Sequence, residues 1–289
     1  MDKLAKALEK ARGERDSVLG NGAPYARMAG ETRRPVSDDY QFHEAPIVSV
    51  ENTVKVSDAA LENNRIVAHR PRSEEADTFR ILRTQVLQTM TQNGMKTLGV
   101  SSPNYGDGKT TIALNLALSI AMDLKQTVLL VDLDLRKPNV MDYLGLQTTI
   151  GLTDYFTRNV PIADCLVRPS FDRLSILPAG RVLENSSEVL GSPKIAALAE
   201  ELRTRYADRL IIYDLPPVLA QDDPLVFLPH VDGLLLVVNE GRTRTHDLKT
   251  CMRALTNATV IGTVLNNSQV VCRPRRAAAR KPEFFNRVK

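Results

Sequence analysis

The sequence predicts an α/β protein of three layers, in which helices cover both faces of a mainly parallel sheet. Short apolar runs rich in β-branched residues alternate with segments of helical periodicity along most of the chain, and this alternation is typical of parallel sheets. Since open sheets of this kind bind ligands at the carboxyl ends of their strands, we expect the functional residues there. The predicted strands are 97–101, 127–131, 174–177, 210–213, 234–238 and 260–265, and the predicted helices are 109–122, 192–206 and 245–255.

The 289 residues are expected to form one large domain with extensions at both ends. Residues 1–19 carry apolar side chains at helical spacing and predict an amphipathic helix. Residues 20–72 are polar, contain four prolines and predict a flexible linker. The ordered domain is expected over residues 73–268, because Ser73 is a suitable N-cap for the amphipathic helix that follows it. Residues 269–289 predict a basic tail.

Charge is unevenly distributed along the chain. The net charge is +4, but the tail alone carries seven basic residues and one acidic residue, so the rest of the chain has a net charge of −2. A basic cluster attracts acidic lipids, nucleic acid or an acidic partner, and it also occurs in solvated tails. We expect contact with an acidic membrane surface and no specific nucleic acid. No apolar run approaches the roughly 20 residues of a spanning helix, so the predicted location is cytoplasmic, peripheral at the inner face of the cell membrane.

The strongest chemical signal follows the first predicted strand, at residues 102–111, and leads directly into an apolar helix. Two glycines allow backbone N–H groups to converge on phosphate oxygens, a lysine reaches the outer phosphates, and a threonine hydroxyl joins a Mg²⁺ shell. This is a P-loop in which Pro103 replaces the usual first glycine. We expect its lysine to lie on the surface of the loop. The predicted nucleotide contacts are Gly106, Asp107, Gly108, Lys109, Thr110 and Thr111.

Two further apolar strands end in carboxylates. Asp132 and Asp134 follow one strand, and Asp214 ends another, just before Pro216 and Pro217. Carboxylates at strand ends suit Mg²⁺ binding and proton acceptance from a nucleophile. Taken separately, the first pair could end a strand in a solvated charged turn, and Asp214 could be a structural aspartate. Beside a P-loop, a shared metal and catalytic site is the better interpretation.

Together these three motifs resemble those of the bacterial tyrosine kinases of capsule and exopolysaccharide production, over residues 73–268. The helix of residues 77–84 resembles the family's assembly helix, with Asp77 where glutamate is usual. The start at residues 6–11 is similar to the exosortase-associated autokinases. The resemblance implies a P-loop NTPase fold related to the partition and cell-division ATPases, and a non-specific protein-tyrosine kinase that uses ATP and Mg²⁺.

The resemblance also implies roles for individual residues and for a partner. It implies a membrane polysaccharide copolymerase, or chain-length protein, as the activator. The implied catalytic residues are Lys109, Asp132, Asp134 and Asp214, and the implied metal ligands are Thr110 and the same three aspartates. Asn266 is implied to lie near the adenine. Arg80 and Arg83 are implied to take part in self-association. Which of Asp132 and Asp134 accepts the proton stays open.

One feature departs from the family pattern. The family usually ends in a tyrosine cluster that is phosphorylated in trans, whereas the last tyrosine here is Tyr213. Autophosphorylation is therefore expected in the linker, at Tyr25 or Tyr40. Two alternatives remain: an ATPase switch of the partition type, although Pro103 and Asn104 stand where its signature lysine would be, and a nucleotide-binding scaffold for polysaccharide export.

Overall fold

A seven-stranded sheet forms the centre of the residues that the computed structural model describes, which are 53–123, 126–205, 209–268 and 285–287. The strand order is β5-β3-β6-β2-β7-β8-β9, and all neighbouring strands are parallel. The strands are β2 (Thr97–Ser101), β3 (Thr127–Asp132), β5 (Leu174–Leu177), β6 (Arg209–Asp214), β7 (Gly233–Asn239), β8 (Val260–Asn266) and β9 (Phe285–Arg287). The six predicted strands and the parallel sheet are confirmed.

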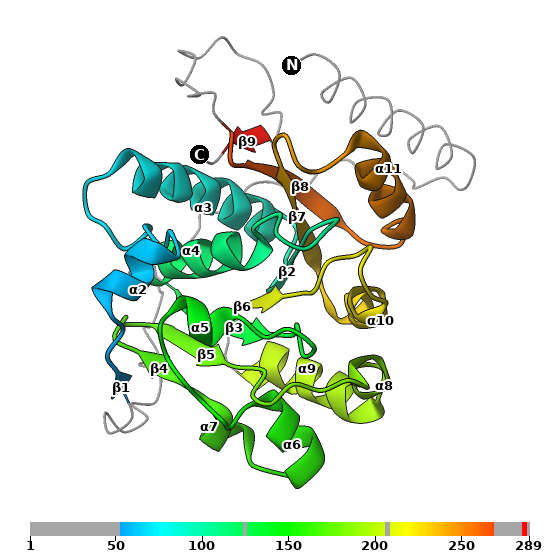
Figure 1. The fold of residues 1–289 in the computed structure, drawn as a ribbon. Coiled ribbons are helices and arrows are strands. Elements are labelled where there is room, and N and C mark those ends of the chain that lie inside the picture. The colour runs from blue at the N-terminus through cyan, green and yellow to red at the C-terminus, as the bar shows by residue number, and fades with distance from the viewer. Residues whose placement is uncertain (1–52, 124–125, 206–208, 269–284, 288–289) are drawn as a thin grey trace, which may run out of the picture. The chain divides into compact units, whose positions relative to one another are not determined.

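Helices cover both faces of this sheet (Figure 1). The long helices α3 (Glu74–Gln92) and α4 (Lys109–Ala121) pack on one face, and α9 (Pro193–Arg205) and α11 (Thr245–Ala254) lie on the other. A small second sheet pairs β1 (Thr53–Val54) with β4 (Arg168–Pro169). The shorter helices are α2 (Asp58–Asn63), α5 (Val140–Tyr143), α6 (Leu152–Arg158), α7 (Ile162–Cys165), α8 (Ser186–Leu190), α10 (Asp223–Phe227) and the 3₁₀ helix η2 (Leu228–His230).

Helix α4 is the central helix of the core. It is apolar on nearly every side because it lies between α3 and the sheet, and its residues from Ile112 to Ala121 are all buried. The strands beneath it are buried on both faces, as expected for a parallel sheet between two helical layers. The strands β2, β3 and β6 are buried up to their last residues. The loops that follow them therefore start from fixed points at one edge of the sheet.

The domain begins at Thr53 rather than at Ser73, so the predicted linker is wrong over residues 53–72. Ile66 is fully buried in the core. The buried Asn115 side chain of α4 accepts hydrogen bonds from the N–H groups of Val67 and Ala68 at 2.8 and 3.0 Å. This segment shows no regular period in its sequence, and its order depends on core packing and on the distant partner Asn115. Residues 20–52 lie outside the described residues.

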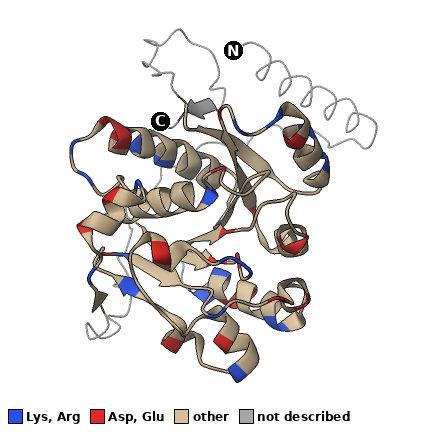
Figure 2. Cartoon of the chain, viewed as in Figure 1, with Lys and Arg blue, Asp and Glu red and all other residues tan. Residues whose placement is uncertain are grey.

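Helix α3 begins as predicted. The Ser73 hydroxyl accepts a hydrogen bond from the N–H of Ala76 at 3.0 Å, and acidic residues fill the first turn (Figure 2). Its two arginines make contacts within the chain. Arg80 pairs with Asp77 and also donates to two carbonyls before the helix, while Arg83 donates to the Ser119 carbonyl of α4 at 2.8 Å. Arg83 therefore ties α3 to α4.

The tail and the N-terminal segment were predicted to flank the domain. Part of the predicted tail, β9, adds an edge strand to the sheet beside β8, so the domain does not end at residue 268. The rest of the tail and the predicted helix of residues 1–19 lie outside the described residues. Within the described part of the chain, no helix has both the length and the apolar character that a membrane span requires.

Candidate active site

The sheet brings the three sequence motifs to one edge. In the strand order, β6 lies between β3 and β2. Asp132 at the end of β3 is in register with Asp214 at the end of β6, and Val100 of β2 is in register with the same aspartate. Because parallel strands point the same way, their carboxyl ends and the loops that follow them share this edge. The predicted clustering of the motifs is therefore observed.

The P-loop connects β2 to α4 with left-handed backbone at both glycines. The φ angles are +79° at Gly106 and +96° at Gly108. A Cβ atom on Gly108 would lie 2.0 Å from the Asn266 side chain, and one on Gly106 would lie 2.6 Å from Arg242. The left-handed conformation favours glycine at both positions, and at Gly108 the Asn266 amide, held by the Asp107 carbonyl, also leaves no room for a Cβ atom. The first N–H groups of α4 lack intrahelical partners and form an anion site.

The loop after β7, residues 240–244, braces the P-loop. The buried Asp107 carboxylate accepts hydrogen bonds from the N–H of Asn104 and from the Thr243 hydroxyl, both at 2.9 Å. The Asn266 side chain donates to the Asp107 carbonyl at 2.9 Å, and the Asn239 side chain donates to the Gly106 carbonyl at 3.3 Å. The side chain of Asp107 is therefore engaged in holding the loop, which leaves its backbone N–H as the group available for a nucleotide.

Lys109 is buried among carboxylates, so the expectation of a surface lysine is wrong. Its Nζ lies 3.1 Å from Asp134 Oδ2, 3.5 Å from Asp214 Oδ1 and 3.2 Å from the Thr110 hydroxyl. That hydroxyl donates to Asp214 Oδ2 at 2.6 Å. Burial lowers the pKa of Lys109, but attraction to Asp214, Asp134 and Asp132 outweighs it and holds the pKa above its usual range. The lysine is charged.

Asp132 makes different contacts from Asp134. One of its oxygens accepts from the N–H groups of Asn139 and Val140 at 3.2 Å, and the other accepts from the N–H of Asp134 at 3.1 Å. Burial, followed by repulsion from Asp214, raises the pKa of Asp132 to about 7. Burial also raises the pKa of Asp214. Asp132 therefore fixes the turn after β3, while Asp134 faces the lysine.

The cluster fits a divalent cation bound together with phosphate groups. Three aspartates surround one lysine in a buried setting, so the carboxyl groups outnumber the single cation that they face. Within the described residues, no three His, Cys, Asp or Glu side chains are arranged to hold a metal ion by themselves. Mg²⁺ is commonly bound by one or two carboxylates, waters and substrate phosphates. The donors here, Thr110 and the carboxylates, suit that mode and supply the charge that Mg²⁺ would neutralise.

The two remaining predicted residues also lie at this edge. Thr111 is half-buried in the first turn of α4, and its carbonyl accepts from Asn115. Asn266 is the last residue of β8. Its side-chain amide donates to the Asp107 carbonyl and thereby lies next to Gly108. Sequence reasoning missed Asn239 and Thr243, although the polar run that follows the apolar strand β7 is a usable signal for a loop at the sheet edge.

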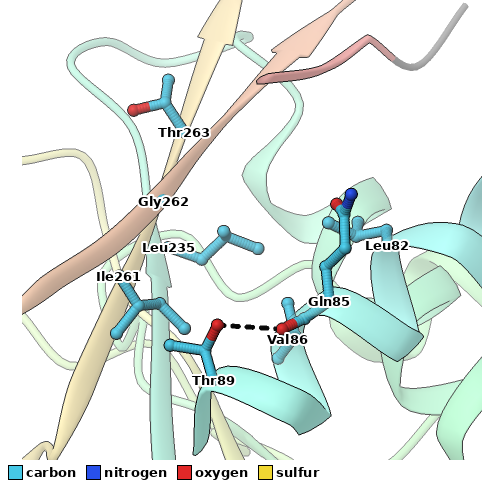
Figure 3. A pocket seen from close by; sticks show the side chains of 8 residues that line it. All are labelled: Leu82, Gln85, Val86, Thr89, Leu235, Ile261, Gly262 and Thr263. Carbon is cyan, nitrogen blue, oxygen red and sulfur yellow. Dashed lines mark hydrogen bonds between the residues drawn. The ribbon is translucent and has the colours of Figure 1, made fainter. Parts of the chain in front are cut away.

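A separate apolar hollow lies between α3 and strands β7 and β8 (Figure 3). Leu82 and Val86 of α3 face Leu235 and Ile261 across it, and the Thr89 hydroxyl donates to the Gln85 carbonyl on its rim. None of its lining residues belongs to the three motifs. It is an apolar packing gap and not part of the candidate active site.

Comparison with known proteins agrees with this geometry. Residues 95–238 match the AAA domain family. The chain is 30% identical over 212 residues to tyrosine-protein kinase YwqD of Bacillus subtilis, covering 73% of this chain and 88% of that protein. This chain belongs to the bacterial tyrosine kinase family. The predicted family and enzyme class are therefore confirmed, whereas the exosortase-associated subfamily stays a prediction.

Other relatives extend the comparison. The kinase domain of VpsO has 32% identity and a TM-score of 0.61, covering 68% of this chain and 96% of that structure. The septum site-determining protein MinD of Pyrococcus horikoshii, solved with Mg-ADP, has 25% identity and a TM-score of 0.51, covering 60% and 71%. The succinoglycan biosynthesis transport protein ExoP of Rhizobium meliloti is 30% identical over 212 residues, but the match spans only 27% of its length. The predicted kinship with partition and cell-division ATPases in fold is confirmed.

The raised pKa of Asp132 predicts how the stability of the ligand-free protein depends on pH. Its carboxyl binds a proton more tightly in the folded state, so this stabilisation is complete below the ordinary pKa of 3.8 and is lost as pH rises through about 7. Each unit of pKa difference corresponds to about 1.4 kcal/mol. Urea unfolding across this range should show the free energy of unfolding falling less steeply in Asp132→Asn than in the parent protein. Equal slopes in the two proteins would contradict the assignment.

Proposed function

We propose that this chain transfers the γ-phosphoryl group of ATP to tyrosine hydroxyls and acts in exopolysaccharide production or export. The observation that carries the proposal is the buried cluster of Lys109, Thr110, Asp134 and Asp214 at the end of a P-loop. Family membership supports tyrosine as the acceptor, and the name of the relative ExoP supports the polysaccharide context. MgATP would supply the transferable phosphoryl group and the divalent cation.

Each part of the site has a distinct role in this proposal. The N–H groups from Gly106 to Thr111 bind phosphate oxygens, and the Lys109 ammonium neutralises charge on them. Thr110, Asp132, Asp134 and Asp214 supply the oxygen donors for the cation. Because Asp132 is held by three backbone N–H groups, we assign proton acceptance from the tyrosine hydroxyl to Asp134. Asn266 would lie near the adenine as well as bracing the loop.

The proposed domain organisation and partners follow from the family. The kinase domain extends from Thr53 and includes β8 and the edge strand β9, preceded by a linker and an N-terminal helix. The basic tail would contact acidic lipids at the inner face of the membrane. A membrane polysaccharide copolymerase would act as the activator. Self-association would use Arg80 and Arg83, which are both part-exposed on α3 and would exchange some of their contacts within the chain for contacts with a neighbour.

Two other functions predict different products from the same site. An ATPase switch would hydrolyse ATP without modifying tyrosine, and a scaffold would bind nucleotide without turnover. Membership of the tyrosine kinase family and the joint presence of lysine, threonine and aspartates at the strand ends favour the kinase. Product analysis after incubation with MgATP, with and without the cytosolic segment of the copolymerase, separates the three functions.

Replacing Lys109 should abolish transfer. Lys109→Ala and Lys109→Met remove the cation beside the phosphates, so the rate of tyrosine phosphorylation should fall at least about 100-fold. The methionine variant keeps most of the buried volume, and thermal melting of both variants reports the fold. Lys96→Ala is the matched control, because Lys96 is exposed at the opposite end of β2 and should retain parental activity. Parental transfer in a folded Lys109→Met variant would exclude the assigned role.

Phosphate should appear in the linker, at Tyr25 or Tyr40, which lie outside the described residues. Tyr213 is fully buried beside Phe227, and burial raises the pKa of its hydroxyl well above the usual range, so it cannot reach a second active site. Mass spectrometry after incubation with MgATP should find modified linker tyrosines in the parent and none in Lys109→Met. Unmodified linker tyrosines together with a phosphorylated added export protein would show that the enzyme modifies other proteins and not itself.

A further inference from the structure

A second polar cluster lies directly beside the turn that carries Asp134. Arg136, two residues further along this turn, donates from Nε to the Ser186 hydroxyl at 2.7 Å and from Nη2 to the Ser187 hydroxyl at 3.1 Å. Both serines begin α8, which packs against α10, and acidic residues mark both helices (Figure 2). The Ser187 hydroxyl in turn contacts Asp223 of α10 at 2.6 Å. Arg136 thus connects the turn to two helices from distant parts of the chain.

Asp223 carries a buried charge that the observed contacts satisfy only in part. It is fully buried, and its Oδ1 lies 3.6 Å from Arg136 Nη2, which is an ion pair without a close hydrogen bond. Its Oδ2 has no hydrogen-bond partner among the described residues. A buried carboxylate without full pairing is costly, so its presence calls for an explanation. The guanidinium of Arg136 is the one cation observed within ion-pair distance of Asp223 in the described chain.

The turn between Asp134 and Lys137 is held on its other sides by fixed contacts. The N–H of Lys137 donates to Asp134, at 3.1 Å to its carbonyl and 3.2 Å to its carboxylate, and the N–H of Leu183 donates to the Leu135 carbonyl at 2.9 Å. Tyr105 of the P-loop lies beneath the Lys137 ammonium, 4.3 Å from ring centroid to Nζ. Arg136 supplies the anchor of this turn on the side of α8 and α10, two residues from Asp134, which contacts Lys109.

We infer that Asp223 is a positioning residue for phosphoryl transfer, which acts through Arg136 to hold the turn of Asp132 and Asp134 against the P-loop. The inference rests on the proposed roles of these two aspartates. Residues that orient catalytic or metal-binding groups from behind lower activity or metal affinity by about 10- to 100-fold when they are replaced. Asp223 lies behind Asp134 in this sense, because Arg136 contacts Asp223 and belongs to the turn that carries Asp134.

The test compares two neighbouring aspartates. Asp223→Asn keeps the shape and removes the charge. Asp222→Asn is the matched control, because the exposed Asp222 contacts the same Ser187 hydroxyl at 2.7 Å without an observed ion pair to Arg136. We expect Asp223→Asn to lower kcat about tenfold or more and to raise the Mg²⁺ concentration that gives half-maximal rate. The melting temperature should match that of the control, which should keep kcat within about twofold of the parent value.

A double-variant cycle separates positioning from general stabilisation. If Asp223 acts through Arg136, then Arg136→Gln and the double variant Arg136→Gln/Asp223→Asn should lose activity to the same extent as Asp223→Asn. Arg136→Gln, at an exposed position, provides the test if Asp223→Asn does not fold. Parental kcat and Mg²⁺ dependence in the single variants, or additive losses in the double variant, would overturn the inference. If the parent transfers no phosphate to tyrosine, the proposed function fails, and weaker MgADP binding by Asp223→Asn still tests the positioning.

Discussion

The structure is organised around negative charge buried at the carboxyl end of a parallel sheet. Asp132 and Asp214 end adjacent strands in register, and Asp134 joins them around a single lysine. Such a group is unfavourable in isolation, because charge taken out of water costs free energy unless it is paired. A divalent cation with nucleotide phosphates would complete the pairing. The cost of the ligand-free cluster would therefore favour the binding of Mg²⁺ together with nucleotide phosphates.

The surrounding fold supplies the rigidity that this arrangement needs. The loop after β7 and the end of β8 hold the P-loop from one side through Thr243 and Asn266. On the other side, Arg136 ties the turn after β3 to α8. Asn115 fastens the first segment of the domain to α4, the helix whose N-terminus forms the anion site. Each brace links segments far apart in sequence, so the site depends on the whole sheet being assembled.

The parallel sheet, the acidic ends of its strands and the P-loop could be predicted from the sequence, for a physical reason. Central strands of a parallel sheet are buried on both faces, so runs such as 128–131 and 234–238 are apolar throughout and stand out against helical segments. Each run ends at the carboxyl edge of the sheet, and a change from apolar to acidic at Asp132 or Asp214 marks that edge. The P-loop glycines were recognisable because backbone conformation requires glycine there.

The remaining features depend on contacts that have no local signature. Residues 53–72 are ordered because Ile66 enters the core and Asn115 satisfies the neighbouring backbone, which no period in the segment reveals. The burial of Lys109 results from carboxylates delivered by two other strands. Likewise, Asp223 follows a loop of ordinary composition, and only the folded chain brings it to Arg136. Long-range pairing of polar groups is the information that a single sequence does not display.

Proton release on nucleotide binding tests the central claim most directly. If Mg²⁺ and phosphates complete the pairing of the buried carboxylates, the binding of MgADP near pH 7 should discharge protons held by the aspartates whose pKa burial has raised, Asp132 above all. Isothermal titration calorimetry in two buffers of different ionisation enthalpy measures the number of protons released per MgADP bound. The account predicts net proton release that is much smaller in Asp132→Asn. Equal release by the variant and the parent, or none by the parent, would contradict it.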